Sequence, residues 1–165
     1  LLRRTLRTRL SGTTAARDAP PAAAAALRGA ARPVRPFGQD FEFARFMGLE
    51  MVERGDGRCR MAIDIDRVRH FNPQGVAHGG VAYSLADTAM GGALTSQMPD
   101  SKWCATLEIK FNYHVGVREG RLICDATVLH QGKRIANIDA RLYQDDRLVA
   151  SANGNFAIFD APLGR

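Results

Sequence analysis

The chain shows two kinds of hydrophobic spacing, one typical of strands and one typical of a helix. Cys59, Met61, Ile63 and Ile65 alternate with polar or small residues, which is the period-two pattern of a half-buried strand. The turn residues Gly55 to Gly57 precede this segment and predict a hairpin, with a second strand before them. Further upstream, the aromatic-rich stretch FARFM is compatible with a short helix.

A helical spacing begins at Gly79 and extends to about Gln97, before Pro99 ends it. The apolar positions that recur with this spacing are Val81, Leu85, Ala86, Ala89, Met90, Ala93 and Leu94. Almost no charge interrupts the segment, so the helix should be buried nearly all round. Gly91 and Gly92 each cost about 1 kcal/mol against alanine inside a helix. We therefore expect another element to pack closely against them.

Four strand-like segments follow the helix: KWCATLEIKFNYH, GRLICDATVLHQ, KRIANIDARLYQ and RLVASANGNFAIF. The first alternates without a break and places one face in the core, comprising Trp103, Ala105, Leu107, Ile109, Phe111 and Tyr113. Glycines and the Asp145-Asp146 pair separate the segments. The pattern predicts an α+β fold in which an antiparallel sheet wraps around one long central helix.

The candidate catalytic residues lie near the start of that helix. The stretch RVRHFNPQGVA reads as a loop, because Asn72-Pro73 and Gly75 are turn residues. A helix that starts at Gly79-Gly80 offers unpaired backbone N–H groups and the positive end of its dipole to a carbonyl oxygen that becomes an oxyanion. His78 and Asn72 can add polar contacts. The alternative is that the two glycines form a tight turn and Asn72 caps it.

Asp87 is the one carboxylate within the apolar helix. It lies eight residues beyond Gly79, about 12 Å along a helix. One chain cannot easily bring both groups to the same carbonyl carbon, whereas two antiparallel helices related by a two-fold axis can. The alternative is that Thr88, Tyr83 or a backbone group satisfies Asp87 within its own chain.

The charge of the chain is concentrated in its first residues. Of the 23 basic and 17 acidic residues, eight and one fall in residues 1–36, which leaves 15 and 16 in residues 37–165. The net charge of +6 therefore does not indicate a nucleic-acid-binding domain. We expect residues 1–36 to be a disordered leader and residues 37–165 to be one domain. An organelle transit peptide is the alternative for the leader, so the expected location is cytoplasmic, with a mitochondrial one as the alternative.

The sequence shows neither a metal-binding motif nor a membrane-spanning stretch. Cys59, Cys104 and Cys124 lie far apart, and no Cys/His spacing suggests a metal site. No stretch reaches the roughly 18 apolar residues that a membrane span requires. Buried, reduced thiols and a protein without membrane segments are expected.

The body of the chain, about residues 41 to 159, resembles the hotdog-fold acyl-CoA thioesterases of the phenylacetic-acid-degradation branch, related to hydroxybenzoyl-CoA thioesterase. The pattern that carries the resemblance is N-P-x-G-x-x-H-G-G-x-x-x-x-L-A-D-T-A, beginning at Asn72, together with the upstream FMGLEMVERGDGRCRMAIDI and a late H-Q-G-K-R. The resemblance implies a hotdog fold, a homodimer that pairs further into a homotetramer, and hydrolysis of an acyl-CoA.

The resemblance also implies roles for particular residues. The Gly79 amide would polarise the thioester carbonyl, His78 and Asn72 would position substrate and water, and Asp87 of a partner chain would act as nucleophile or general base. Many relatives carry Ser or Thr one turn after the acid, where this chain has Gly91. No metal or cofactor is implied, since coenzyme A is part of the substrate. The remaining residues expected to bind substrate are Gly80, Thr88, Met90, Lys133 and Arg134, the last two through the phosphates of the nucleotide. Arg118 or Arg121 could also contact these phosphates as a cation.

Two other functions are compatible with the same fold. An enoyl-CoA hydratase would use an acid two positions before the Asn-Pro pair, where this chain has His70. A hotdog module that binds acyl-CoA without hydrolysing it would not need the carboxylate of Asp87. For a hydrolase, the small apolar helix positions favour an aromatic or medium-sized acyl group, with phenylacetyl and hydroxyphenyl types as the first to test.

Overall fold

A computed structural model describes residues 41–162 of the chain, so the leader predicted in residues 1–36 lies outside the described part. The elements in chain order are α1 (Glu42–Met47), β1 (Leu49–Gly55), β2 (Arg58–Asp64), α2 (Arg67–His70), α3 (Gly79–Thr95), β3 (Lys102–Tyr113), β4 (Arg121–Gln131), β5 (Ile135–Gln144) and β6 (Arg147–Asp160). The hairpin, the long helix and the four later strands predicted from the sequence are confirmed.

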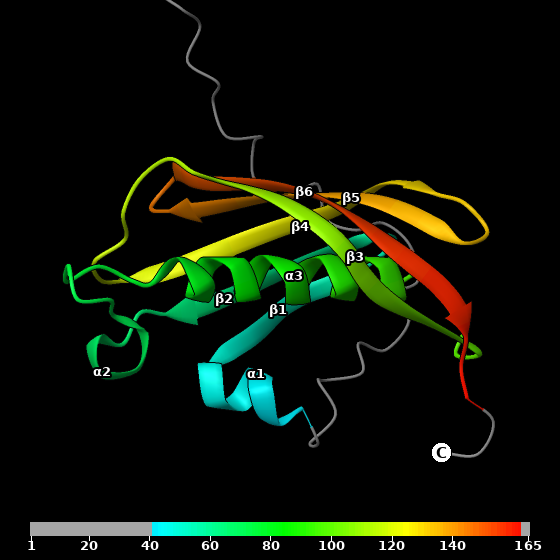
Figure 1. Ribbon diagram of the computed structural model, residues 1–165, viewed down its shortest axis with the longest axis horizontal. Coiled ribbons are helices and arrows are strands. Elements are labelled where there is room, and N and C mark those ends of the chain that lie inside the picture. Colours follow the sequence, from blue (N-terminus) through cyan, green and yellow to red (C-terminus); the bar gives the residue numbers. More distant parts are fainter. Residues whose placement is uncertain (1–40, 163–165) are drawn as a thin grey trace, which may run out of the picture.

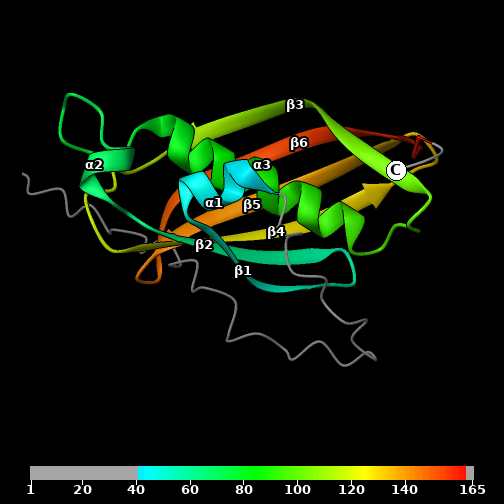
Figure 2. The same ribbon diagram turned by 90° about the horizontal axis from the view of Figure 1, so that it is seen from below.

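The six strands form one antiparallel sheet in the order β1-β2-β4-β5-β6-β3. Figure 1 shows β3 to β6 above α3 and β1 and β2 curving down behind it, and Figure 2 shows α3 lying along the inner side of the sheet. In both views α1 lies on the side of α3 that faces away from the centre of the sheet. This arrangement confirms the predicted α+β architecture. No helix between residues 41 and 162 is long and apolar enough to cross a bilayer.

The core forms where α3 meets the sheet. The buried positions of α3 are Val81, Leu85, Ala86, Ala89, Met90, Gly92, Ala93 and Leu94. Gly92 confirms the expected close packing, because a Cβ added there would lie 2.8 Å from the Cys59 sulfur. Gly91 does not, since a Cβ there would meet nothing within 4 Å. The side of α3 that carries Gly91 therefore borders open space.

The prediction of one continuous core face on β3 is wrong, because a β-bulge interrupts the strand. Its pairing with β6 shifts register between Thr106 and Glu108, which leaves Leu107 as the extra residue. Thr106 faces α3, and beyond the bulge Phe111 also faces α3, where it packs against Tyr83. The alternation therefore changes face at residue 107. Trp103, on the other face, remains 44% exposed.

Candidate active site

The segment before α3 contains the one-turn helix α2, which sequence periodicity did not predict. Asp66 caps this helix, and its carboxylate accepts hydrogen bonds of 2.9 Å from the N–H groups of Val68 and Arg69. The backbone hydrogen bond from Arg69 is the main reason why the pKa of Asp66 is lowered. A four-residue helix is too short to leave a periodic pattern, but the local hydrogen bonds of Asp66 explain why it forms.

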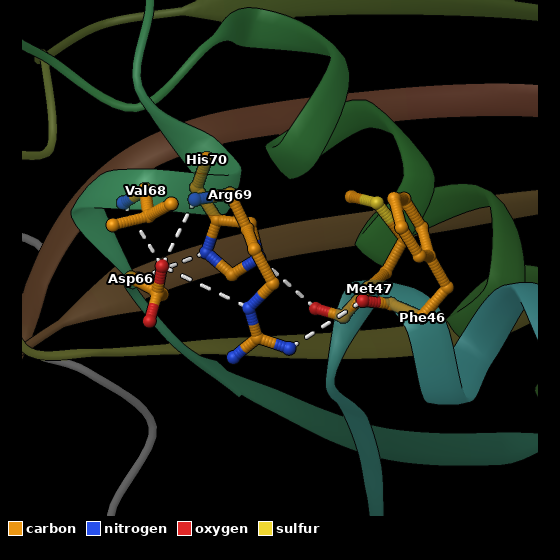
Figure 3. Close-up of polar contacts among 6 residues, drawn as sticks. All are labelled: Phe46, Met47, Asp66, Val68, Arg69 and His70. Atoms are coloured by element: carbon orange, nitrogen blue, oxygen red, sulfur yellow. Dashed lines mark hydrogen bonds and ion pairs between the residues drawn. The ribbon is translucent and has the colours of Figure 1, made fainter.

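His70 connects the α2 segment to α1 through hydrogen bonds. It is the one buried polar side chain of the described residues, with 1% of its surface exposed. Its Nδ1 accepts from the Asp66 N–H at 2.9 Å, and its Nε2 donates to the Met47 carbonyl at 3.1 Å (Figure 3). Its own carbonyl accepts from the His78 N–H at 2.7 Å. His70 thus joins α1 and α2 to the residue that precedes α3.

Asn72 stabilises its own loop. Its side-chain oxygen accepts from the backbone N–H groups of Gln74 and Val76, at 3.0 and 3.3 Å. These contacts match the alternative in which Asn72 caps the turn, and they occupy the oxygen. The side-chain NH₂ makes no hydrogen bond with another described residue, so it is the part of Asn72 that can donate to a substrate.

The two glycines at the start of α3 differ in what their N–H groups do. The Gly80 N–H donates to Nδ1 of His78 at 2.9 Å, so His78 serves as the N-cap of the helix. The Gly79 N–H has no acceptor among residues 41–162. The N–H of Gly79, the predicted oxyanion donor, is therefore the free one of the two. Because Nδ1 of His78 accepts, its proton lies on Nε2, which can donate to a ligand.

A pocket of about 530 Å³ opens at this end of α3. Its walls are mainly apolar, with His78, Gly79, Gly80 and Tyr113 on one side; the rest of the lining comprises Val76, Ala77, Ala82, His114, Val115, Gly116, Val117, Leu122, Val149 and Ala150. The Tyr113 hydroxyl donates to the Gly79 carbonyl at 3.0 Å. A Cβ on Gly79 would approach the Tyr113 hydroxyl oxygen to 3.0 Å and the ring carbons to 3.1–3.2 Å, so close packing favours glycine here.

Asp87 lies outside that pocket lining. Its carboxylate accepts a hydrogen bond of 2.7 Å from the hydroxyl of Thr106 on β3. Neither Thr88 nor Tyr83 makes this contact; the Thr88 hydroxyl instead donates to the Ser84 carbonyl at 2.8 Å. Within one chain, the free Gly79 N–H and the carboxylate therefore occupy different places along α3. The partner of Asp87 was missed because the bulge that turns Thr106 toward the helix has no sequence signal.

Two other predicted binding residues lie away from the pocket. Met90 is completely buried in the core, with 0% of its surface exposed, so in this arrangement it cannot contact a substrate. Its apolar spacing is that of the sheet-facing side of α3, and that side is filled by the core. Thr88 is partly exposed beside Asp87.

The cations proposed for the nucleotide phosphates lie at both ends of α3. Lys133 and Arg134 are exposed in the β4–β5 turn, next to Gln131, which bonds Gln97 beyond the C-terminal end of α3. Arg118 lies at the other end, where its guanidinium donates to the Gly75 carbonyl at 3.1 Å. The arrangement thus separates Lys133 and Arg134 from the Gly79 pocket of their own chain.

Comparison with known proteins now identifies the family. The family model described as "Thioesterase superfamily" matches residues 74–151, which include the pocket, Gly79 and Asp87. Over 114 residues the chain is 30% identical to ComA2 of Bacillus subtilis, provisionally named as an esterase, and the match covers 68% of this chain and 90% of that protein. The chain belongs to the thioesterase superfamily.

Solved structures of relatives agree with this assignment. Thioesterase PA1618 of Pseudomonas aeruginosa, in a mutant form, is 26% identical, with a TM-score of 0.68 over 72% of this chain and 86% of that one. The phenylacetic acid degradation protein PaaI of Thermus thermophilus, also a mutant, is 26% identical, with a TM-score of 0.65 over 70% and 97% of the two chains. The resemblance to phenylacetic-acid-degradation proteins, the hotdog fold and the expected thioester-hydrolase class are confirmed.

Proposed function

We propose that this thioesterase hydrolyses acyl-CoA at a site shared by two copies of the chain. Gly79 of one copy would bind the thioester carbonyl, and Asp87 of the other copy would attack it or activate water. The observation that carries the proposal is the free Gly79 N–H beside an apolar pocket that lacks Asp87. A second, antiparallel α3 would bring the missing carboxylate to the carbonyl carbon.

The chemistry can follow either of two balanced routes. In the first, an Asp87 oxygen adds to the carbonyl carbon, the C–S bond breaks, coenzyme A leaves as its thiolate, and water opens the resulting anhydride. In the second, Asp87 accepts a proton from water as the water oxygen adds to the carbonyl, and the thiolate leaves when the tetrahedral intermediate collapses. In both routes the negative charge that develops on the carbonyl oxygen is stabilised by the Gly79 N–H.

The substrate would be an aromatic or medium-sized acyl group on coenzyme A. The mainly apolar pocket at Gly79 suits the pantetheine arm and the thioester. Arg118 has no acidic partner within ion-pair distance in the described residues, so it can meet a phosphate. In a two-fold arrangement, Lys133 and Arg134 of the second copy would approach the same end. No cofactor is required, because coenzyme A enters with the substrate.

Mixing two inactive variants tests the shared site. Asp87→Asn removes the carboxylate, and Gly79→Pro removes the N–H at the first helical position, where proline is accepted. A mixed dimer of the two variants regains one intact site from Gly79 of one chain and Asp87 of the other. After unfolding and refolding an equal mixture, about a quarter of the wild-type activity should return, since half of the dimers are mixed and each has one working site.

The outcome of mixing separates the possible arrangements. Activity that stays at the level of the separate variants would show that each site is contained in one chain. Wild-type protein that binds acyl-CoA but releases no thiol would favour the non-catalytic module instead. No structural observation favours the hydratase alternative, because His70, which stands at the acid position, is buried and holds α1 and α2 together.

A further inference from the structure

Arg54, on β1, reaches across to the C-terminal half of α3. Its Nε donates to the Gly92 carbonyl at 3.0 Å, and its Nη2 donates to the Thr95 hydroxyl at 2.7 Å. The Thr95 hydroxyl in turn donates to the Gly91 carbonyl at 2.8 Å. The guanidinium is therefore held against the last turn of α3.

The positive charge of Arg54 has no acidic partner in the described part of the chain. No carboxylate of residues 41–162 lies within ion-pair distance of it, although its hydrogen bonds are partly buried. An arginine side chain has five N–H donors, and the printed contacts of Arg54 use only one from Nε and one from Nη2. The edge formed by Nη1 and the second hydrogen of Nη2 matches the two oxygens of a carboxylate.

The guanidinium and the candidate catalytic carboxylate border the same part of the molecule. Burial raises the pKa of the half-buried Cys104 thiol, the nearby Asp87 raises it further, and Arg54 lowers it. The geometry agrees, because Arg54 bonds the Gly92 carbonyl, five residues along α3 from Asp87, and Cys104 lies on β3 two residues before Thr106, which bonds Asp87. Gly91 lies between Asp87 and the guanidinium of Arg54, one helical turn beyond Asp87, at a position where a side chain would meet open space. Arg54 bonds Gly92 and Thr95, five and eight residues beyond Asp87, which is about 7.5 to 12 Å along the helix at 1.5 Å per residue. This span has room for a benzoyl ring or a six-carbon chain together with the contact distances at its two ends.

We propose that Arg54 selects acyl groups that end in a carboxylate. The thioester carbonyl would sit at Asp87, the acyl group would pass over Gly91, and its distal carboxylate would pair with the free edge of the Arg54 guanidinium. This inference rests on the proposed function and names its substrate class: monothioesters of aromatic or medium-length dicarboxylic acids. The residues of α3, of which Asp87 is the one charged residue, indicate only an aromatic or medium-sized acyl group. Arg54 on β1 supplies a cation that would compensate the charge of a carboxylate at the end of that acyl group.

A simpler role for Arg54 is to hold the end of α3. The last turn of α3 contains no basic residue, and a cation near a helix C-terminus is favourable. That role predicts an effect on stability alone. Selection of a carboxylate predicts an effect on the ratio of kcat/KM between matched substrates, which anchoring would not change.

The experiment compares adipoyl-CoA with hexanoyl-CoA, and 4-carboxybenzoyl-CoA with 4-methylbenzoyl-CoA. In each pair a carboxylate replaces a methyl group at the same place. The wild-type protein should favour the carboxylated member by on the order of tenfold or more in kcat/KM, as expected for a charge-assisted bidentate contact. Arg54→Met should remove or reverse that preference, and Arg54→Lys should retain part of it.

Arg58→Met is the matched control, because it removes the same charge from an exposed position on the neighbouring strand β2. Its substrate ratio should equal that of the wild-type protein. Hydrolysis of all four thioesters with no preference for the carboxylate would overturn the role of Arg54 and leave the thioesterase proposal intact. Failure to hydrolyse any acyl-CoA would contradict the proposed function itself. If Arg54→Met does not fold, the wild-type ratio and Arg54→Lys still decide the matter.

Discussion

Replacing Gly79 by proline isolates one backbone hydrogen-bond donor. Gly79 is the first residue of α3, and the residue before it, His78, has φ −59° and ψ 139°, which is the extended geometry that a following proline requires. Proline at this position therefore keeps the helix and removes the N–H that we assign to the oxyanion. Losing one such donor lowers kcat by about 10²- to 10³-fold, or about 2.7–4 kcal/mol.

Gly79→Ala provides the control for steric effects. Either substitution adds a Cβ that would lie 3.0–3.2 Å from the hydroxyl oxygen and ring carbons of Tyr113, so either requires that side chain to move by a few tenths of an ångström. Tyr113 is 56% exposed and can do so. Alanine keeps the N–H, so the difference in kcat between the two variants measures the donor.

The assay is thiol release at saturating acyl-CoA, with thermal unfolding to check that both variants fold. We expect the two melting temperatures to be similar and the proline variant to be at least about a hundredfold slower than the alanine variant. Equal kcat values for two folded variants would refute the assignment of Gly79 as the oxyanion donor.

Three further predictions concern the surroundings of the site. Thr106→Val removes the hydrogen bond to Asp87 and should lower kcat by about tenfold, whereas Thr106→Ser should stay near the wild-type rate; steady-state kinetics measures both. His70→Ala leaves two partly buried backbone groups, the Asp66 N–H and the Met47 carbonyl, without their partner, and should lower the free energy of unfolding by about 1–3 kcal/mol in a urea titration. Burial raises the pKa of Cys59 from 9.0 to about 12, so its contribution to stability should be constant below pH 9 and fall between pH 9 and about 12, an effect that Cys59→Ser should abolish in urea titrations across that range.

The elements with strong periodicity could be predicted from the sequence. The helix of residues 79–95 follows from apolar spacing, and the hairpin before it follows from the turn at Gly57, which adopts a positive φ of 73°. The strand of residues 102–113 was identified, but its core face was not, because the alternation continues in the sequence through Leu107 while the pairing with β6 shifts there.

The candidate site was predictable in residue type but not in detail. The start of the helix contains both Gly79 and Gly80, and the family resemblance names Gly79 as the donor. The cap formed by His78 explains why the Gly79 N–H is the one that remains free. It also marks Asp87 as unusual, but the hydroxyl that bonds it comes from a strand whose register depends on β6. Arg54 carried no signal, because nothing in its local sequence shows that it reaches Gly92, 38 residues away.

The position of β3 at one edge of the sheet has a consequence for how the chain folds during synthesis. Only β6 joins β3 to the other strands, and β6 is the last strand of the described chain. The apolar face of α3 leaves the ribosome before β4, β5 and β6, which later cover it, and domains fold as units once their sequence is available. Until β6 is made, β3 has no place in the sheet, and Thr106 cannot be held against Asp87. The proposed catalytic arrangement can therefore form only after β6 has been synthesised. Until then the apolar face of α3 is uncovered on the growing chain, where chaperones can bind it.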